Sequence, residues 1–178
     1  FSLKNKKAVI TGGGSGIGQA ISEVFAQEGA HVHILDLNAE GGEKVVHGII
    51  SNGGKATLHV CSVANQAEIV KAIESIGRVD ILINNAGIAH VGNLENCPEQ
   101  DFEKVFQVNV KGAYNALYAV IPKMKAQGGG VILNLASIAA LVGISDRFAY
   151  SMSKGAIYAM SLSVARDYMK DNIRCNSI

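Results

Sequence analysis

The sequence predicts an α/β protein, a doubly wound parallel sheet with helices on both faces. Short apolar runs of strand length alternate with longer amphipathic segments along the chain, as in βαβ units with right-handed crossovers. Glycine-rich or polar turns follow several of the apolar runs, where the carboxyl ends of parallel strands meet. The length of 178 residues fits a single domain over residues 1–178 that buries a substantial core.

The first strand and helix enclose a glycine run. The apolar segment 8–10 is short and bounded by polar residues and glycines, which is typical of a buried strand. Ile17, Ile21 and Val24 then recur at helical spacing, so we expect a helix to begin inside the glycine run. The first turn of a helix has backbone N–H groups without partners and a partial positive charge, and it therefore suits a phosphate.

Three glycines and one carboxylate favour a dinucleotide as the ligand of this turn. Gly12 and Gly14 permit close backbone approach, and Gly18 lets the helix pack against the strand. A second strand over 31–35 ends in Asp36, at the spacing expected of a carboxylate that binds the adenosine ribose. No Lys-Ser or Lys-Thr pair follows the glycines, which excludes an NTPase phosphate loop. The alternatives are an ordinary glycine turn and a helix or turn cap at Asp36.

The alternation continues through the first half of the chain. Apolar pairs four apart predict a helix over 39–51, and a third strand follows over 56–60. The sequence Asn-Gln-Ala-Glu at 65–68 resembles a capping box that opens a helix ending at Gly77. A fourth strand over 79–83 runs into the turn Asn84-Asn85-Ala86-Gly87. Because ligands bind beyond the carboxyl ends of such strands, these turns are expected to share one edge.

The second half has longer helices. A helix is predicted over 98–124, and Pro122 should bend or end it. A strand over 131–135, a helix over 148–169 and a sixth strand over 173–178 complete the pattern.

The charge balance favours no polyanionic partner. A net charge of +1 creates no field that attracts nucleic acid or an anionic membrane, so neither partner is predicted. The lysines at positions 4, 6 and 7 are interpreted as a solvated lead-in to the first strand.

The cysteines indicate a reducing compartment. Three widely spaced cysteines, at positions 61, 97 and 175, have no spacing typical of metal ligands, and we expect free, mostly buried thiols and no metal site. No signal peptide is apparent, and the longest apolar region, 131–144, is too short for a membrane span. The protein is therefore expected to be soluble and cytoplasmic.

A tyrosine and a lysine form a second candidate site. Tyr150 and Lys154 are four residues apart on a predicted helix, so their side chains lie on one face. A tyrosine phenol ordinarily has a pKa near 10, and moving such a pKa to about 7 requires roughly 4 kcal/mol. A lysine ammonium and an oxidised nicotinamide are two cations that favour the phenolate in a dry site. Ser137, which follows the fifth strand, would bind the same substrate oxygen. A lone Tyr-x-x-x-Lys pair also occurs on solvated helices.

Together these motifs resemble the short-chain dehydrogenase/reductase family. The segment 11–18 is similar to its cofactor motif, 84–87 to its fourth-strand motif, and Ser137 with 150–154 to its catalytic motifs, in the family's order over nearly the whole chain. The resemblance implies a Rossmann-like fold and an NAD-dependent oxidoreductase that interconverts a secondary alcohol and a ketone. A non-catalytic nucleotide-binding scaffold of the same fold is the alternative.

The resemblance also implies residue roles. Tyr150 would be the acid/base, Lys154 would promote its ionisation and hold the nicotinamide ribose, and Ser137 would position the substrate oxygen. Asn109 would hold a water in a proton relay; otherwise it is a buried helix residue that bonds its own backbone. Thr11 would brace the glycine turn, and Asn85 would position the fourth strand near the cofactor. The implied cofactor-binding residues are Thr11, Gly12, Gly14, Ser15, Gly16, Ile17, Gly18, Asp36, Ser62, Val63, Asn85, Ala86, Gly87, Tyr150 and Lys154.

Asp36 favours NAD over NADP, because its charge would repel a 2′-phosphate and neither Ser15 nor Leu37 supplies a basic residue. Where the family often has an acidic residue against adenine, this chain has Ser62, which still accepts a hydrogen bond. Relatives continue beyond the position of Ile178 into a substrate lid and a further strand, so we expect both to be missing from this chain.

The substrate and the assembly are less closely defined. The residues near the expected site, His90, Ala139, Leu141 and Val142, suit a modest substrate such as a sugar-derived hydroxy acid or a 3-oxoacyl chain, although His90 is more typical of an ordinary loop histidine. The resemblance implies a homotetramer that pairs the helices around 100–124 and 148–170. Their small residues, Ala113, Ala116, Gly155, Ala156 and Ala159, permit close approach or pack internally.

Overall fold

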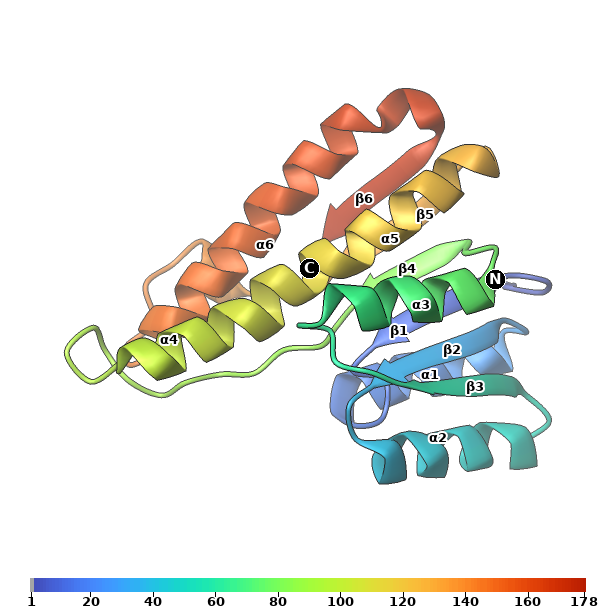
Figure 1. Ribbon diagram of the computed structural model, residues 1–178, viewed down its shortest axis with the longest axis horizontal. Coiled ribbons are helices and arrows are strands. Elements are labelled where there is room, and N and C mark those ends of the chain that lie inside the picture. Colours follow the sequence, from blue (N-terminus) through green and yellow to red (C-terminus); the bar gives the residue numbers. More distant parts are fainter. Residues whose placement is uncertain (1) are drawn as a thin grey trace.

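The computed structural model describes residues 2–178 and contains one parallel sheet of six strands in the order β3-β2-β1-β4-β5-β6 (Figure 1). The strands are β1 (Lys7–Thr11), β2 (His31–Asp36), β3 (Lys55–Val60), β4 (Ile81–Asn84), β5 (Gly130–Asn134) and β6 (Ile173–Ser177). The α-helices are α1 (Gly16–Gln27), α2 (Ala39–Ser51), α3 (Gln66–Ile76), α4 (Glu99–Val105), α5 (Gly112–Ala126) and α6 (Phe148–Asp167). The doubly wound α/β architecture predicted from the sequence is confirmed.

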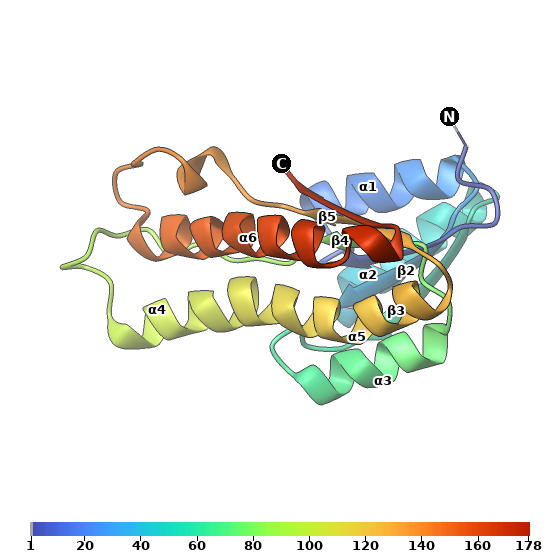
Figure 2. The same cartoon turned by 90° about the horizontal axis from the view of Figure 1, so that it is seen from above.

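Helices cover both faces of the sheet, and each face has its own apolar core. Helices α1 and α2 pack on one face, against the side chains of Ile10, Val32 and Ile34. Helices α3, α5 and α6 pack on the other face (Figure 2). The side chains of Leu82 and Ile132 are fully buried there. None of the helices within residues 2–178 is long and apolar enough to cross a membrane.

The predicted helix over 98–124 has a different internal structure. It consists of α4, the π-helical segment η1 (Phe106–Lys111) and α5, and it continues through Pro122 to Ala126. The prediction that Pro122 ends the helix is therefore wrong. Proline deprives the carbonyl four residues earlier of its donor, but that residue, Tyr118, is exposed and water can replace the bond.

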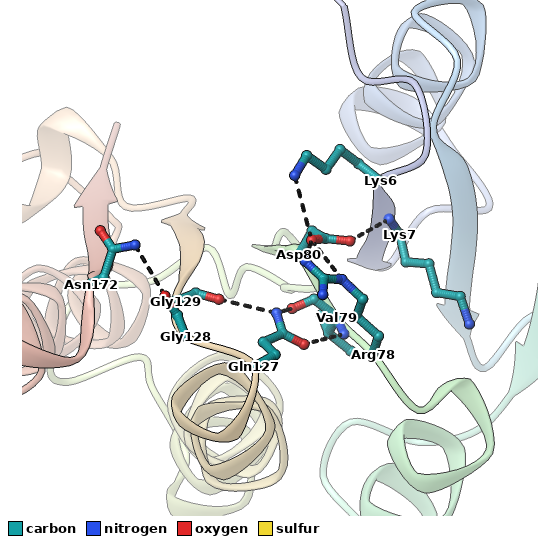
Figure 3. A network of polar contacts seen from close by, with 9 residues as sticks. All are labelled: Lys6, Lys7, Arg78, Val79, Asp80, Gln127, Gly128, Gly129 and Asn172. Carbon is teal, nitrogen blue, oxygen red and sulfur yellow. Dashed lines mark hydrogen bonds and ion pairs between the residues drawn. The ribbon is translucent and has the colours of Figure 1, made fainter.

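The fourth strand also begins later than predicted, because Val79 and Asp80 precede it in a polar network at the amino edge of the sheet (Figure 3). The Asp80 carboxylate, nearly buried, accepts from the Arg78 guanidinium at 2.7 and 3.0 Å and from the Lys7 backbone N–H at 3.0 Å, and Lys6 lies 3.7 Å away. Burial alone raises the pKa of this carboxyl, but the hydrogen bonds and the charges of Arg78 and Lys6 together lower it.

The same network joins two more loops. The Gln127 side chain bonds the backbone of Val79 through both its oxygen and its nitrogen, and it also donates to the Gly129 carbonyl. Asn172, in the loop before β6, donates to the Gly128 carbonyl. Lysines 6 and 7 therefore do more than lead into β1: Lys6 faces Asp80, and the Lys7 ammonium donates to the carbonyl of Ile76.

Three histidines of β2 and β3 lie together. The sequence pattern of these segments predicts two strands but not this cluster of histidines. His33 Nδ1 is 3.1 Å from His59 Nε2, and the His31 and His33 ring centres are 4.3 Å apart. His33 is only 5% exposed, and within residues 2–178 its Nε2 has no hydrogen-bond partner. Burial, followed by the charges of His31, His59 and Lys7, lowers the pKa of His33 to about 3.

The strand register places the functional turns at one edge. Thr11 is level with Asn84, Asn84 with Asn134, and Asn134 with Ser177, so these strands end together. Helix α4 and the beginning of α6 extend past this carboxyl edge (Figure 1).

Candidate active site

A cavity of about 650 Å³ lies at the carboxyl edge, within the size range of cofactor sites. Most of the site residues predicted from the sequence line it: Gly12, Ser15, Gly16, Ile17, Asp36, Ser62, Val63, Asn85, Ala86, Gly87, Tyr150 and Lys154. Thr11 and Asn109 border a smaller cavity beside it, and Gly14 and Gly18 are buried and line neither cavity. Ser137 belongs to neither lining.

The glycines of the first turn are required by contacts with neighbouring segments. Gly12 has φ of +64°, and a Cβ there would lie 2.9 Å from Ala86 Cα. A Cβ at Gly14 would lie 2.9 Å from the Asp36 carboxylate, and one at Gly18 would overlap the Gly12 carbonyl. The turn leads directly into α1, and Ser15, Gly16 and Ile17 at the start of this helix line the cavity. The unpaired N–H groups of a first helical turn suit the pyrophosphate of a dinucleotide.

Thr11 and Asn85 have roles that differ from those expected. The Thr11 hydroxyl oxygen accepts from the backbone N–H groups of Asn85 and Ala86, both at 3.1 Å, so Thr11 braces the turn after β4. The glycine turn is braced by Asn85, whose amide donates to the carbonyls of Thr11 and Gly12 at 3.1 and 2.9 Å. The family resemblance indicates Thr11 and Asn85 but not their hydrogen-bond partners. These partners lie on neighbouring strands, so they depend on the strand order of the sheet.

Asp36 contacts the glycine turn as well as the cavity. Its two oxygens accept from the backbone N–H groups of Gly14 and Asn38, each at 2.9 Å, and Asn38 caps α2. The turn cap at Asp36, which was the alternative to a ribose-binding role, is thus present in the bond from Asn38 N–H. Each carboxylate oxygen still has a lone pair that can accept from a ribose hydroxyl.

The end of β3 contributes Ser62 to the cavity. Glu68 accepts from the Ser62 backbone N–H at 2.8 Å and from the Asn65 side-chain amide at 2.7 Å, whereas a capping box would bond the Asn65 backbone. Asn65 caps α3 as expected. Cys61 also lines the cavity, and burial, with the charges of Glu68 and Asp36, raises the pKa of its thiol to about 11.

Tyr150 and Lys154 lie on one face of α6, as predicted. The Lys154 ammonium is 5.6 Å from the centre of the Tyr150 ring and donates to the Leu135 carbonyl at 2.5 Å. The Lys154 side chain is only 7% exposed, and burial lowers the pKa of its ammonium. A buried ammonium that has one hydrogen bond to the chain keeps two donors for other groups.

The side-chain amide of Asn109 bonds other parts of the chain through its oxygen and both of its N–H groups. Its amide oxygen accepts from Ile88 N–H at 2.8 Å, and its nitrogen donates to the Ile88 carbonyl and the Ser153 hydroxyl, both at 2.9 Å. Ser153 in turn donates to the Tyr150 carbonyl at 2.7 Å. The alternative of a bond to its own backbone is therefore wrong, and Ser153 joins η1 to the turn of α6 that carries Tyr150. Sequence reasoning missed Ser153, although it lies within the catalytic motif.

Ser137 precedes a short 3₁₀ turn, η2 (Ile138–Ala140), and its oxygen accepts from Ala139 N–H at 3.1 Å. Its hydroxyl proton is available for a further acceptor. The loop after it bonds the loop after β4, because Gly92 N–H donates to the Asp146 carbonyl. His90 in that second loop lies 3.5 Å from the Asp101 carboxylate. Leu141 and Val142 are exposed.

Charged groups in these linings are few. Within residues 2–178 no group of three or more His, Cys, Asp or Glu side chains is placed to hold a metal ion. The three cysteines are free thiols, two of them buried.

Comparison with known proteins identifies the family. The family profile described as "short chain dehydrogenase" matches residues 6–178. The chain is 44% identical over 180 residues to an uncharacterised oxidoreductase of Thermotoga maritima, covering all of this chain and 72% of the relative.

Solved structures of dehydrogenases superpose closely on this chain. The structure of an NAD⁺-bound xylitol dehydrogenase superposes with a TM-score of 0.96 at 35% identity, over 99% of this chain and 70% of the other. A gluconate 5-dehydrogenase of Burkholderia cenocepacia, in complex with NADP and tartrate, superposes with a TM-score of 0.94 at 30% identity, over 99% of this chain and 71% of the other. The chain therefore belongs to the short-chain dehydrogenase/reductase family, oxidoreductases of alcohols and ketones that use a nicotinamide dinucleotide.

Proposed function

We propose that the protein is an NAD-dependent dehydrogenase of secondary alcohols, with Tyr150 as the acid/base. The observation that carries this proposal is the position of Tyr150 and Lys154 in the wall of the same cavity as the glycine turn and Asp36. When bound, NAD supplies the hydride acceptor. The glycine turn would hold its pyrophosphate, Asp36 its adenosine ribose, and Ser62 and Val63 its adenine.

The side chains of α6 and of the loop after β5 would move the proton. The Tyr150 phenolate takes the proton of the substrate alcohol, and the nearby Lys154 ammonium stabilises the negative charge. Ser137 donates its free hydroxyl proton to the same substrate oxygen and fixes its position. Asn109 and Ser153 hold the backbone of Tyr150, which keeps the phenol in place.

The cofactor preference rests on Asp36. Its carboxylate lines the cavity beside the exposed Leu37, and no basic residue of the glycine turn is present to bind a 2′-phosphate. A 2′-phosphate would meet the negative charge of Asp36 at close range, which favours NAD. Related structures contain either NAD or NADP, so Asp36 has to be tested directly.

The substrate proposal is a small sugar-derived hydroxy acid, with a 3-oxoacyl chain as the second candidate. The structural relatives include a xylitol dehydrogenase and a gluconate 5-dehydrogenase. Ala139, next to Ser137, is buried and does not line the large cavity, so the support for this substrate class comes from these relatives.

We also propose a cytoplasmic homotetramer. Free thiols at all three cysteines support a reducing compartment. Tyr114 and Tyr118 of α5 and Leu162 of α6 are exposed at 46, 56 and 56%, which supports helix pairing between subunits. Ala113 and Ala116 are buried within the chain, so the close approach expected of them is internal. Light scattering after gel filtration measures the subunit number.

Absorbance of NADH at 340 nm tests the proposed reaction. Turnover of gluconate, xylitol or a 3-hydroxyacyl thioester with NAD, and its loss in Tyr150→Phe with NADH binding retained, is the expected result. Retained turnover in Tyr150→Phe would exclude Tyr150 as the acid/base. A protein that binds NADH but oxidises no alcohol at all would favour the non-catalytic scaffold.

A further inference from the structure

The turn after β3 forms part of the wall of the large cavity, and two helices hold it. Ser62 and Val63 of this turn line the cavity. Helices α3 and α5 pack side by side on the same face of the sheet (Figure 2). Each helix bonds the turn: Glu68 of α3 accepts from the Ser62 backbone N–H, and Asn115 of α5 donates to the Val63 carbonyl.

The asparagine of α5 is completely buried, and its partners orient its amide. Asn115 is 0% exposed, its nitrogen lies 2.8 Å from the Val63 carbonyl oxygen, and Gln66 Nε2 lies 3.3 Å from its oxygen. Because a carbonyl only accepts, the nitrogen has to face Val63, which leaves the oxygen toward Gln66. A buried amide is costly unless it is hydrogen-bonded, and the shorter of these two bonds goes to the turn. The polar residue at position 115 therefore matches the turn after β3.

The peptide groups on both sides of Val63 are fixed in direction. The Ser62 carbonyl accepts from the Asn65 backbone N–H at 3.0 Å, and the Val63 carbonyl accepts from Asn115. The C=O and N–H of a trans peptide point in opposite directions, so the first bond directs the Val63 N–H away from Asn65. This N–H donates to no other group within residues 2–178, and it is available to a ligand.

Helix α5 also sets the position of the Val63 side chain. Gly112 lies about one turn before Asn115 and is buried, and a Cβ there would lie 2.8 Å from Val63 Cγ2. The glycine thus lets Val63 pack directly on the helix. Because a valine side chain has little rotamer freedom, one turn of α5 fixes both the backbone and the side chain of Val63.

We propose that Asn115 is a positioning residue for the cofactor, which holds the turn after β3 in the shape that receives the adenine half of the dinucleotide. This role rests on the proposed function, in which Ser62 and Val63 contact the adenine. Without the Asn115 amide, the Val63 carbonyl loses its partner and the turn rearranges to find another. The cofactor must then order the turn as it binds, which weakens binding and leaves the chemistry at Tyr150 unchanged.

Fluorescence titration with NADH, and displacement of NADH by AMP, test the proposal. AMP carries the adenine and its ribose without the nicotinamide half. We expect Asn115→Leu, which keeps the approximate shape of the side chain without its polar atoms, to weaken the binding of NADH and of AMP each about tenfold, since a hydrogen bond that shapes the site is lost. Unchanged AMP affinity in Asn115→Leu would overturn the proposal, whatever happens to NADH.

Gln66→Met is the matched control. It removes the other hydrogen bond of the Asn115 amide and leaves the bond to Val63. This variant is expected to bind AMP as tightly as the wild type. A loss as large as that in Asn115→Leu would show that the contact between α3 and α5, and not the bond to Val63, shapes the site, and the proposal would be wrong.

Steady-state kinetics separate positioning from damage to the whole domain. In Asn115→Leu the KM for NAD should rise about tenfold while kcat at saturating NAD stays at the wild-type level, because only cofactor binding is weakened. A lower kcat with an unchanged KM would contradict the positioning role.

A second variant keeps the test decisive if Asn115→Leu does not fold. Gly112→Ala keeps the Asn115 amide and favours the helix, but its Cβ displaces the Val63 side chain. It should also weaken AMP binding, and unchanged affinity would overturn the proposal. A wild type that binds neither NADH nor AMP would refute the proposed function itself, whereas binding by the wild type with no loss in the variants would refute the positioning role alone.

Discussion

Acidification should destabilise the protein through His33, and replacing this residue by valine should remove that effect. His33 is buried on β2, and its pKa is about 3 in the folded chain, against an ordinary value of 6.5. The folded state therefore keeps the ring neutral, whereas the unfolded chain takes up a proton below pH 6.5. Stability is complete above that pH and is lost as the pH falls from 6.5 toward 3.

The magnitude follows from the two pKa values. At pH 5.0, about 1.5 pH units below the ordinary pKa of 6.5, protonation of the histidine stabilises the unfolded chain. At about 1.36 kcal/mol per pH unit, His33 lowers the free energy of unfolding by at most about 2 kcal/mol. Between pH 7.5 and 5.0 the free energy of unfolding of the wild type should fall by about that much more than that of His33→Val. Valine suits a buried strand position, so the variant is expected to fold.

Urea unfolding followed by circular dichroism at pH 7.5 and 5.0 measures both free energies. His47→Gln, which removes an exposed histidine of α2, controls for the loss of any histidine. An equal fall in wild type and His33→Val would show that the His33 ring is not what opposes protonation, and the reasoning from its burial would be wrong.

Three other substitutions test the site and the amino edge. Gly18→Ala should weaken NADH binding at least about tenfold, measured by fluorescence titration, because its Cβ overlaps the Gly12 carbonyl; unchanged affinity would contradict this packing. Asp36→Ser should lower the NAD-to-NADP ratio of kcat/KM by about tenfold or more, and an unchanged ratio would remove Asp36 as the discriminating residue. Asp80→Asn should cost about 1–3 kcal/mol of unfolding free energy at pH 7, with a smaller cost as the pH falls below the ordinary pKa of 3.8, because the pKa of this carboxyl is lowered in the folded chain; a cost independent of pH would contradict its charged pairing with Arg78.

The sequence predicts the strand-turn-helix units because their signals are local. Apolar periodicity and the glycines at 12, 14 and 18 are sufficient to place the first turn, and Asn65 caps α3 as its position predicts. The edge of the sheet that carries the site follows from the parallel arrangement alone.

Partners across the sheet are not local, and the sequence does not predict them. Thr11 meets the turn after β4 only because β1 and β4 are neighbours, a fact of strand order. The Asn84 and Asn134 side chains pair for the same reason, through register. The π-helical turn at Asn109 leaves the apolar pattern almost unchanged, so periodicity gives one continuous helix there.

The hydrogen bonds around Asp80 and Gln127 make the two ends of the sheet mechanically unequal. They join segments that are up to 165 residues apart in sequence, from Lys7 to Asn172, at the end opposite the large cavity. Local opening at that end requires several of these bonds to break together, whereas the exposed loops at the cavity end are held by fewer. Backbone amides near Val79 and Gly129 should therefore exchange with solvent deuterium more slowly than those near Leu141. Local opening of the protein should start at the carboxyl edge of the sheet, while the amino edge stays closed.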